Sequence, residues 1–258
     1  MLEVTDLSKV YKVKVKEEKA LFSKTIEKRA VSGVSFDMHK GQAMACIGEN
    51  GAGKSTLIKC ALGILSPTEG QIKLFGEDPR KKKNYCMSKV GVVFGQKTNL
   101  WIDIPVKESY LAMRHIYKVD KNVFNRNYEM VMELLDLKEI INIPARRLSL
   151  GQRMRADIGL VLLHGPELLF MDEPTLGLDI NVKRTIRQFL KQMNQENGTS
   201  ILLTSHDLDD IDEICDDAIV LSKGRQIYSG TLKDLKHRYK KPDMDDIVST
   251  IFAEGKVV

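Results

Sequence analysis

The sequence predicts an α/β fold with a largely parallel sheet, an antiparallel β edge layer and an inserted α-helical subdomain. Three observations predict it. Strand-like segments cluster at the two ends of the chain, apolar residues follow helical spacing in the middle, and a glycine-rich stretch joins a strand to a helix. The segments expected as strands are residues 2–7, 32–39, 42–47, 71–75, 90–94, 167–171, 200–204, 218–223 and 225–229.

The strand segments differ in how their polar residues are distributed. ELLF and SILLTS, which begin at Glu167 and Ser200, have little polar alternation, as expected of buried strands in a parallel sheet. The early segments alternate and suit an antiparallel edge. The helices of the insert are predicted from three segments, ESYLAMRHIY, VFNRNYEMVMELLDL and QRMRADIGLVLL. We therefore expect one domain over residues 1–230, a helical subdomain at about 97–163 within it, and a tail at 231–258 of two short helical segments interrupted at Pro242.

Composition excludes several classes of protein. The 258 residues are 43% hydrophobic and 29% charged, and no stretch approaches the roughly 18 apolar residues of a membrane span. The N-terminus, MLEVTDLSKVYKV, lacks the apolar core of a secretory signal, so we expect a cytoplasmic location. A net charge of +5 is too modest to indicate nucleic acid as a partner, and none is expected. The cysteines form no C-x-x-C pair, which predicts reduced structural thiols. They are Cys46, Cys60, Cys86 and Cys215.

The glycine-rich stretch GENGAGKST matches the pattern G-x-x-x-x-G-K-[ST] in full. Its glycines are Gly48, Gly51 and Gly53. Glycines let the backbone bend closely around a phosphate chain and aim its N–H groups inward. Lys54 would reach the β- and γ-phosphates, Ser55 would place its hydroxyl on Mg²⁺, and a helix from about Thr56 would add the positive end of its dipole. The stretch predicts nucleotide binding by a P-loop NTPase core.

The segment ELLFMDEP places two carboxylates at the end of an apolar strand. Ligands of open α/β sheets bind at the carboxyl ends of the strands. Asp172 would hold the metal, and Glu173 would polarise the water that attacks the γ-phosphate. The alternative is a solvated acidic turn, which the complete phosphate loop disfavours.

The string RRLSLGQRMRADIGLVLL places Ser149 at the start of a predicted helix, where it can serve as the N-cap. The backbone N–H groups behind such a cap form a second anion-binding end. Because this end is nearly 100 residues from the phosphate loop, we expect it to complete the site of another subunit.

The order of these motifs resembles that of ABC-transporter ATPase subunits over roughly residues 2 to 230. LSLGQ followed by LLFMDEPTLGLD resembles their signature, Walker B and D-loop. Gln96 in VVFGQKTNL resembles the Q-loop glutamine, which bridges Mg²⁺, the water and the membrane partner, and His206 in LLTSHD resembles the switch histidine. Tyr11 resembles the aromatic that stacks on adenine, although it can also be an ordinary strand residue. Asp179 would relay between the two sites.

The resemblance thus implies three sets of site residues. Those expected to bind the nucleotide are Tyr11, Gly48, Asn50, Gly51, Gly53, Lys54, Ser55, Thr56, Ser149, Gly151, Gln152 and Asp179. Those expected at the metal are Ser55, Gln96 and Asp172, and those expected to act in hydrolysis are Glu173, His206 and Gln96. One position departs from the family pattern, because Leu150 stands where the signature most often has glycine, and a side chain there constrains how the site closes.

The resemblance also implies partners and a function. ATP and Mg²⁺ are the expected cofactors, and the expected partners are a second copy or a related cassette and the subunits of a membrane permease. We expect an ATPase, peripheral at the inner face of the cell membrane, that drives transport. LSLGQRMR and FGQKTNLW resemble a bacterial branch considered export-type. The alternative is a soluble ABC ATPase acting in ribosome regulation, cofactor assembly or DNA repair; the transported substrate cannot be read from this chain.

Three further segments have two interpretations each. The basic stretches at residues 13–29 and 80–83 are expected to be solvated, with anionic headgroups as the alternative partner. The acidic run DLDDIDEICDD, from Asp207, lacks the glycine of a calcium loop and is expected to be a solvated start of a helix. Trp101 would either contact the permease or anchor the small core of the insert.

Overall fold

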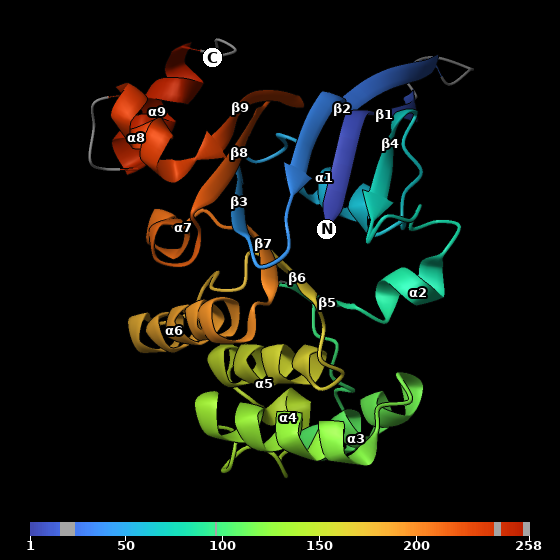
Figure 1. Cartoon of the computed structure of the whole chain (residues 1–258), viewed down its shortest axis with the longest axis vertical. Helices are drawn as coiled ribbons and strands as arrows, with labels where there is room; N and C mark the ends of the chain where they lie inside the picture. Colours follow the sequence, from blue (N-terminus) through green and yellow to red (C-terminus); the bar gives the residue numbers. More distant parts are fainter. Residues whose placement is uncertain (16–23, 96, 240–243, 255–258) are drawn as a thin grey trace. The chain divides into compact units, whose positions relative to one another are not determined.

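The computed structural model describes residues 1–15, 24–95, 97–239 and 244–254 and divides the chain into two compact units. The first unit consists of Met1–His39, Cys46–Cys86 and Ala218–Val258, and the second of Lys40–Ala45 and Met87–Asp217. Strands and helices alternate along the chain (Figure 1), which confirms the predicted α/β class. Among the described residues, no helix has both the length and the apolar character that a membrane crossing needs.

An antiparallel layer forms the basis of the first unit. β1 (Leu2–Val15) pairs antiparallel with both β2 (Lys24–Met38) and β4 (Glu69–Leu74), as the alternating early segments predicted. The order continues from β2 to β9 (Arg225–Thr231) and then to β8 (Asp217–Ser222). This layer brings the N-terminal hairpin next to strands from the far end of the sequence.

β1 and β2 are longer than the sequence predicted. Their pairing continues through Lys12 opposite Glu27 and Val13 opposite Ile26, so much of the basic stretch is strand. Lys12 and Glu27 carry opposite charges, and Val13 and Ile26 are both apolar; both kinds of cross-strand pair stabilise a sheet. Residues 16–23 of this stretch lie outside the described part of the chain.

Short helices accompany this layer. They are α1 (Lys54–Ala61), α2 (Lys83–Met87), α8 (Leu232–Tyr239) and α9 (Met244–Glu254). α8 contacts both β9 and α9, so the tail is helical on both sides of the described gap, and Pro242 falls inside that gap. The tail boundary at residue 231 and the limits of the helical subdomain remain predictions.

Parallel strands form the centre of the second unit. The order is β3-β7-β6-β5, with β3 (Ala43–Gly48) contributing its first residues, then β7 (Ser200–Thr204), β6 (Leu168–Asp172) and β5 (Val90–Phe94). All these pairings are parallel, and β7 is buried along its whole length. The apolar runs therefore form the buried parallel strands that the sequence predicted. In this register the last residues of β6 and β7, Asp172 and Thr204, lie side by side.

The helices of the second unit follow the predicted segments closely. α3 (Val106–Ile116) and α4 (Lys121–Leu134) both contact α5 (Leu150–Leu162), and Figure 1 shows these three helices together. Tyr110 is fully buried among them, and its hydroxyl donates to the carbonyl oxygen of Ala156 at 2.7 Å. The unit also contains the short 3-10 helix η1 (Ala145–Arg147), α6 (Ile180–Asn197) and α7 (Leu208–Ile214), and α6 contacts α7.

Candidate functional site

The glycine-rich loop lies in the first unit, between the buried end of β3 and the start of α1. Gly53 is the N-cap of α1 with φ of 108°. The start of a helix carries backbone N–H groups and the positive end of the helix dipole, which fits an anion at this end. Lys54 is buried, and its Nζ donates to the carbonyl oxygen of Gly48 at 2.5 Å and to that of Glu49 at 3.3 Å. The lysine amine is thus held against the loop itself.

Two loop glycines are required by close packing within this unit. A Cβ on Gly48 would lie 2.6 Å from the carbonyl oxygen of Leu221, and one on Gly53 would lie 2.5 Å from that of Ala30. No other residue fits at either position, so the glycines set the loop against β8 and β2 as well as giving it freedom to bend. The remaining loop positions are open to a ligand: Gly51, Asn50 and Ser55 are exposed, and Thr56 is half-buried.

Tyr11 lies near this loop, as the adenine-stacking role requires. Its hydroxyl oxygen is 3.5 Å from Oγ1 of Thr56, and Lys9 Nζ lies 5.5 Å from the centre of its ring. The ring is only half-buried. The structure therefore places the Tyr11 hydroxyl beside Thr56 of the phosphate loop.

The two predicted carboxylates lie in the second unit, where β6 ends. Oδ1 of Asp172 accepts a hydrogen bond from the Thr204 hydroxyl at 2.6 Å. The backbone N–H of Glu173 donates to the carbonyl oxygen of Thr204 at 3.0 Å. Thr204 was not among the predicted site residues, although its place at the end of the run SILLT was the available signal. It orients one carboxylate and anchors the backbone of the next.

Glu173 has φ of 57°, in the left-handed region that residues with side chains rarely adopt. A strained backbone at such a position turns the side chain away from the strand direction. Gly95 lies against it: its N–H donates to the carbonyl oxygen of Asp172 at 2.7 Å, and a Cβ on Gly95 would collide with the carbonyl oxygen of Glu173. The next residue is Gln96, which was predicted to bind the metal and to act in hydrolysis. It lies outside the described residues.

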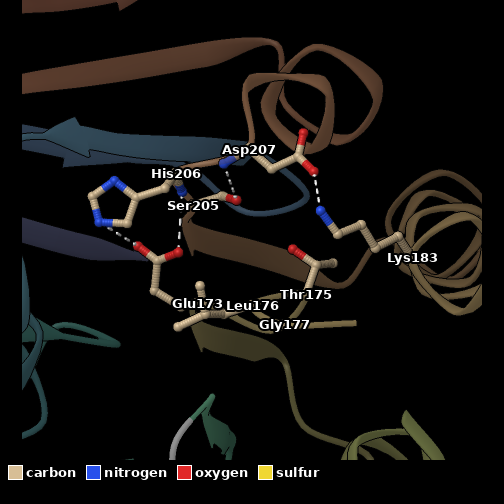
Figure 2. Close-up of a pocket in the computed structure, with 8 residues that line it drawn as sticks. All are labelled: Glu173, Thr175, Leu176, Gly177, Lys183, Ser205, His206 and Asp207. Carbon is tan, nitrogen blue, oxygen red and sulfur yellow. Dashed lines mark hydrogen bonds and ion pairs between the residues drawn. The ribbon is translucent and has the colours of Figure 1, made fainter. Parts of the chain in front are cut away.

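Glu173 and His206 come together, as Figure 2 shows. The backbone N–H of His206 donates to Oε2 of Glu173 at 3.0 Å, and Nε2 of the ring lies 3.4 Å from Oε1. Within the described part of the chain, Oε1 is buried and accepts no hydrogen bond. A buried carboxylate oxygen in this condition can accept one from a water molecule.

This carboxylate and the imidazole line a pocket of about 320 Å³ in the second unit. The lining residues are Glu173, Thr175, Leu176, Gly177, Lys183, Ser205, His206 and Asp207. On the far side of the histidine, Lys183 Nζ donates to Oδ2 of Asp207 at 2.6 Å. Burial opposes the charge on Asp207, but the hydrogen bond from Lys183 and the charge of Arg187 outweigh it and lower the pKa of this carboxyl.

The LSLGQ residues form the start of α5. Ser149 is the N-cap as predicted, and its Oγ accepts from the Gln152 N–H at 3.2 Å. The Gln152 side chain accepts in return from the Ser149 N–H at 3.0 Å, which completes a capping box. Gly151 packs on α6, because a Cβ there would lie 3.1 Å from Val182. Leu150 is 39% exposed, so its side chain does not fill the core.

Asp179 caps the next helix. One oxygen of its carboxylate accepts from the N–H groups of Asn181 and Val182, both at 3.1 Å. This is the ordinary work of an aspartate at an N-cap. The predicted relay role of Asp179 remains a prediction.

Trp101 follows β5 and is exposed. Its side chain is 56% exposed and that of Ile102 is 50% exposed. The backbone N–H of Trp101 donates to Ser109 Oγ at 3.0 Å, so the loop is fixed through its backbone. The interpretation of Trp101 as an anchor inside the core of the insert is therefore wrong.

Comparison with known proteins gives a consistent result. A sequence profile of the family described as "ABC transporter" matches residues 31–176. The ABC transporter ATP-binding protein NatA of Bacillus subtilis is 29% identical over 99% of each chain. The linearmycin resistance ATP-binding protein LnrL of the same species is 33% identical, over 86% of this chain and 69% of that protein. The methionine import ATP-binding protein MetN 1 of Listeria monocytogenes is 32% identical, over 100% of this chain and 78% of that protein.

A solved structure described as the ATP binding subunit of an ABC transporter superposes with a TM-score of 0.82. It is 24% identical and covers 98% of this chain and 99% of its own. At this level of identity the match speaks for the fold alone, and it agrees with the P-loop NTPase core predicted from the sequence.

Proposed function

The chain belongs to the ABC transporter family of ATPases, and from this premise we propose that it dimerises on ATP and drives an associated membrane permease. One observation carries the proposal. Glu173, which directly follows Asp172 at the end of β6, pairs with His206. Hydrolysis of a phosphate needs a base that activates the attacking water and a second group that orients this base.

The phosphate loop holds the nucleotide by its backbone and by Lys54. α1 follows the loop directly, and the backbone N–H groups at its start are proposed to face the phosphates. The Lys54 amine, which now donates to loop carbonyls, has the donors to reach the β- and γ-phosphates. Tyr11 stacks on the adenine ring from its place near Thr56.

The residues proposed at the metal fit Mg²⁺. A carboxylate and a hydroxyl are the hard oxygen ligands that this ion prefers, and Asp172 and Ser55 supply one of each. Asp172 is oriented by the hydroxyl of Thr204, in the manner of groups that support metal ligands. When bound, Mg²⁺ neutralises charge on the phosphate oxygens. Gln96 is proposed as a further ligand.

Glu173 holds the attacking water and takes up its proton. Its Oε1 is buried and accepts no hydrogen bond from the described residues, so it can receive one from water. Oε2 is fixed by the His206 N–H, which prevents the carboxylate from rotating away. The imidazole of His206 is 43% exposed, and its Nε2 lies 3.4 Å from this carboxylate. The pair thus positions the water and stabilises the charge that develops.

A second copy of the chain, or a related cassette, completes the site. The capping box leaves Ser149 exposed at the start of α5, where a partner's γ-phosphate can approach the helix end. Gly151 and Gln152 belong to the same turn, and Asp179 begins the helix on which Gly151 packs. These residues are proposed to contact the nucleotide held by the other subunit.

The permease places the chain at the inner face of the cell membrane. We propose that the direction of transport is export, because the segments LSLGQRMR and FGQKTNLW resemble those of an export-type branch. Among the relatives, LnrL is described as a resistance protein and MetN 1 as an import protein. A soluble ABC ATPase remains the second candidate.

Affinity capture tests the proposal. A tagged Glu173→Gln chain, expressed in its native host and supplied with ATP, is expected to bring multi-helix membrane proteins out of detergent-solubilised membranes. Lys54→Ala serves as the matched control for nucleotide binding, because it removes the phosphate-reaching amine. Recovery of ribosomes or of soluble assemblies, with no membrane protein, would instead support the second candidate.

A further inference from the structure

Asp210 departs from the prediction made for its segment. The acidic run from Asp207 was expected to be solvated, and Asp209 is indeed 80% exposed at its side chain. Asp210, the next residue on α7, is 0% exposed. Since a buried carboxylate is costly without partners, its surroundings must supply them.

Three donors from three different elements reach this carboxylate. Ser205 Oγ donates to Oδ2 at 2.6 Å, and the Thr175 hydroxyl donates to the same oxygen. Arg187 Nε, from α6, donates to Oδ1 at 2.5 Å. Each donor is itself buried, with at most 9% of its surface exposed. The hydrogen bonds are therefore shielded from water and geometrically exacting.

Arg187 supplies a positive charge directly beside the Asp210 carboxylate. Its guanidinium also meets Asp207 at 3.0 Å, Glu213 at 3.1 Å and Asp209 at 3.8 Å. A guanidinium forked among several carboxylates has little freedom to rotate. The cluster ties α6 to α7 at one fixed orientation.

The two hydroxyls belong to the loops that carry the proposed hydrolytic residues. Thr175 is two residues after Glu173, and Ser205 directly precedes His206. Both line the same pocket as those residues, as Figure 2 shows. One oxygen of one carboxylate therefore joins the loop after β6 to the loop after β7.

We propose that Asp210 is a positioning residue that holds Glu173 and His206 at their working separation, through Thr175 and Ser205. The inference rests on the hydrolytic roles proposed for that pair. In this role Asp210 contacts neither nucleotide nor water. It acts by fixing the spacing of two loops.

A carboxylate is required because all three partners donate. An asparagine of the same shape has one oxygen and one NH₂ group, which cannot accept. Asp210→Asn therefore leaves at least one of the three donors facing another donor in a buried site. The loops that carry Glu173 and His206 should then shift, which should lower turnover more than nucleotide binding.

Steady-state ATPase assays on the full chain test the inference. Asp210→Asn is expected to lower kcat at least about tenfold while the KM for ATP stays within about threefold. Asp209→Asn is the matched control, on the same helix and with the same change of charge. Asp209 is 80% exposed and lies 3.8 Å from Arg187, so the loss of this exposed pair should keep kcat within about twofold. Circular dichroism melting curves establish that each variant is folded at the assay temperature.

A double-mutant cycle separates positioning from general damage. In a His206→Ala background, Asp210→Asn should lower kcat by less than about twofold, because the residue that it positions is gone. An equal loss in both backgrounds would show that Asp210 acts independently of His206, and the inference would fall. Retention of kcat by Asp210→Asn would overturn it as well.

Milder variants keep the test decisive if Asp210→Asn does not fold. Thr175→Val and Ser205→Ala each remove one hydroxyl and leave the Arg187–Asp210 pair, and each should lower kcat without raising KM. Full activity in both would overturn the inference. If His206→Ala and Glu173→Gln themselves retain kcat, the proposed hydrolytic roles are wrong; if they lose it and the Asp210 variants do not, only the positioning role fails.

Discussion

His206 Nε2 lies 3.4 Å from Oε1 of Glu173, and the His206 backbone N–H holds the other oxygen of the same carboxylate at 3.0 Å. The contact arises because β6 and β7 are neighbouring parallel strands, and each residue follows the end of one of them. A carboxylate held by backbone keeps its orientation whatever the protonation of the ring. The arrangement suits a base that must meet a water molecule from one direction.

Glu173→Gln should retain ATP binding and lose most turnover. Glutamine preserves the shape of the side chain and the acceptor for the His206 N–H, but it cannot take up a proton. Nucleotide affinity and steady-state hydrolysis measured on the same preparation test this. Glu167→Gln, in a surface pair with Lys89 just before β6, is the matched control and should retain activity. A rate within about threefold of wild type, a barrier change of only ~0.7 kcal/mol, would exclude the role.

The parallel strands and the strand-end carboxylates could be predicted from the sequence because their patterns are local. An unbroken apolar run such as SILLT can only be buried, and a carboxylate directly after one must lie at a strand end. The adjacency of Glu173 and His206 could not be predicted in this way. It depends on β6 and β7 being neighbours, and strand order is set by packing between segments far apart in the chain.

The long hairpin and the buried Asp210 escaped prediction for related reasons. Lys12 and Glu27 sit in a run of charges that resembles solvated surface, and only their opposition across two strands makes the segment a sheet. Asp210 and the exposed Asp209 are chemically identical in sequence. The buried hydroxyls that donate to Asp210, those of Thr175 and Ser205, lie in two loops outside α7.

Glu173→Gln with saturating ATP and Mg²⁺ should elute as a dimer in size-exclusion chromatography and as a monomer without nucleotide. The reason is that the phosphate loop and the Ser149 helix end are proposed to bind one nucleotide from two subunits. Adding Lys54→Ala to the same chain should abolish the dimer, since ATP is then not held. A protein that stays monomeric with saturating ATP would mean that the composite site is wrong or that the partner is a different cassette.

Stability should fall in mild acid because of His164. Burial lowers the pKa of this imidazole from 6.5 to about 4. Its Nε2 lies 3.1 Å from the carbonyl oxygen of Val90, and its ring stacks on Tyr117 with centroids 4.1 Å apart. The unfolded chain takes up a proton near pH 6.5 and the folded chain only near pH 4, so the stabilisation present above pH 6.5 is lost as the pH falls through this window.

Urea unfolding at pH 7.5 and pH 5.0 measures the effect. Between these values the histidine should account for a loss of about 2 kcal/mol in the free energy of unfolding. His164→Gln removes the titration and should reduce the difference between the two pH values by about that amount. His237→Gln, at an exposed position on α8, is the control and should leave it unchanged. An identical pH dependence in wild type and His164→Gln would contradict the assignment.

Trp101→Ala should weaken association with the permease without harming the isolated subunit. The side chain is 56% exposed and its loop is held by the backbone bond to Ser109, so truncation removes little from the core. Exposed aromatic rings of this kind favour the centres of interfaces, where truncation costs ~2 kcal/mol. The melting temperature and basal ATPase rate should stay close to wild type. The affinity for a co-expressed permease, followed by co-purification, should fall about thirtyfold.

Ile116→Ala provides the comparison, because Ile116 is another exposed apolar residue of the same helical region, 62% exposed at the end of α3. Its loss should leave permease binding intact if the contact is specific to the loop after β5. Gln96, which is proposed as a metal ligand, lies five residues before Trp101 in the sequence. A Trp101→Ala subunit that binds the permease normally would place the coupling contact elsewhere on the helical region. Equal losses of permease binding in Trp101→Ala and Ile116→Ala would indicate a broad apolar surface instead of a single anchor.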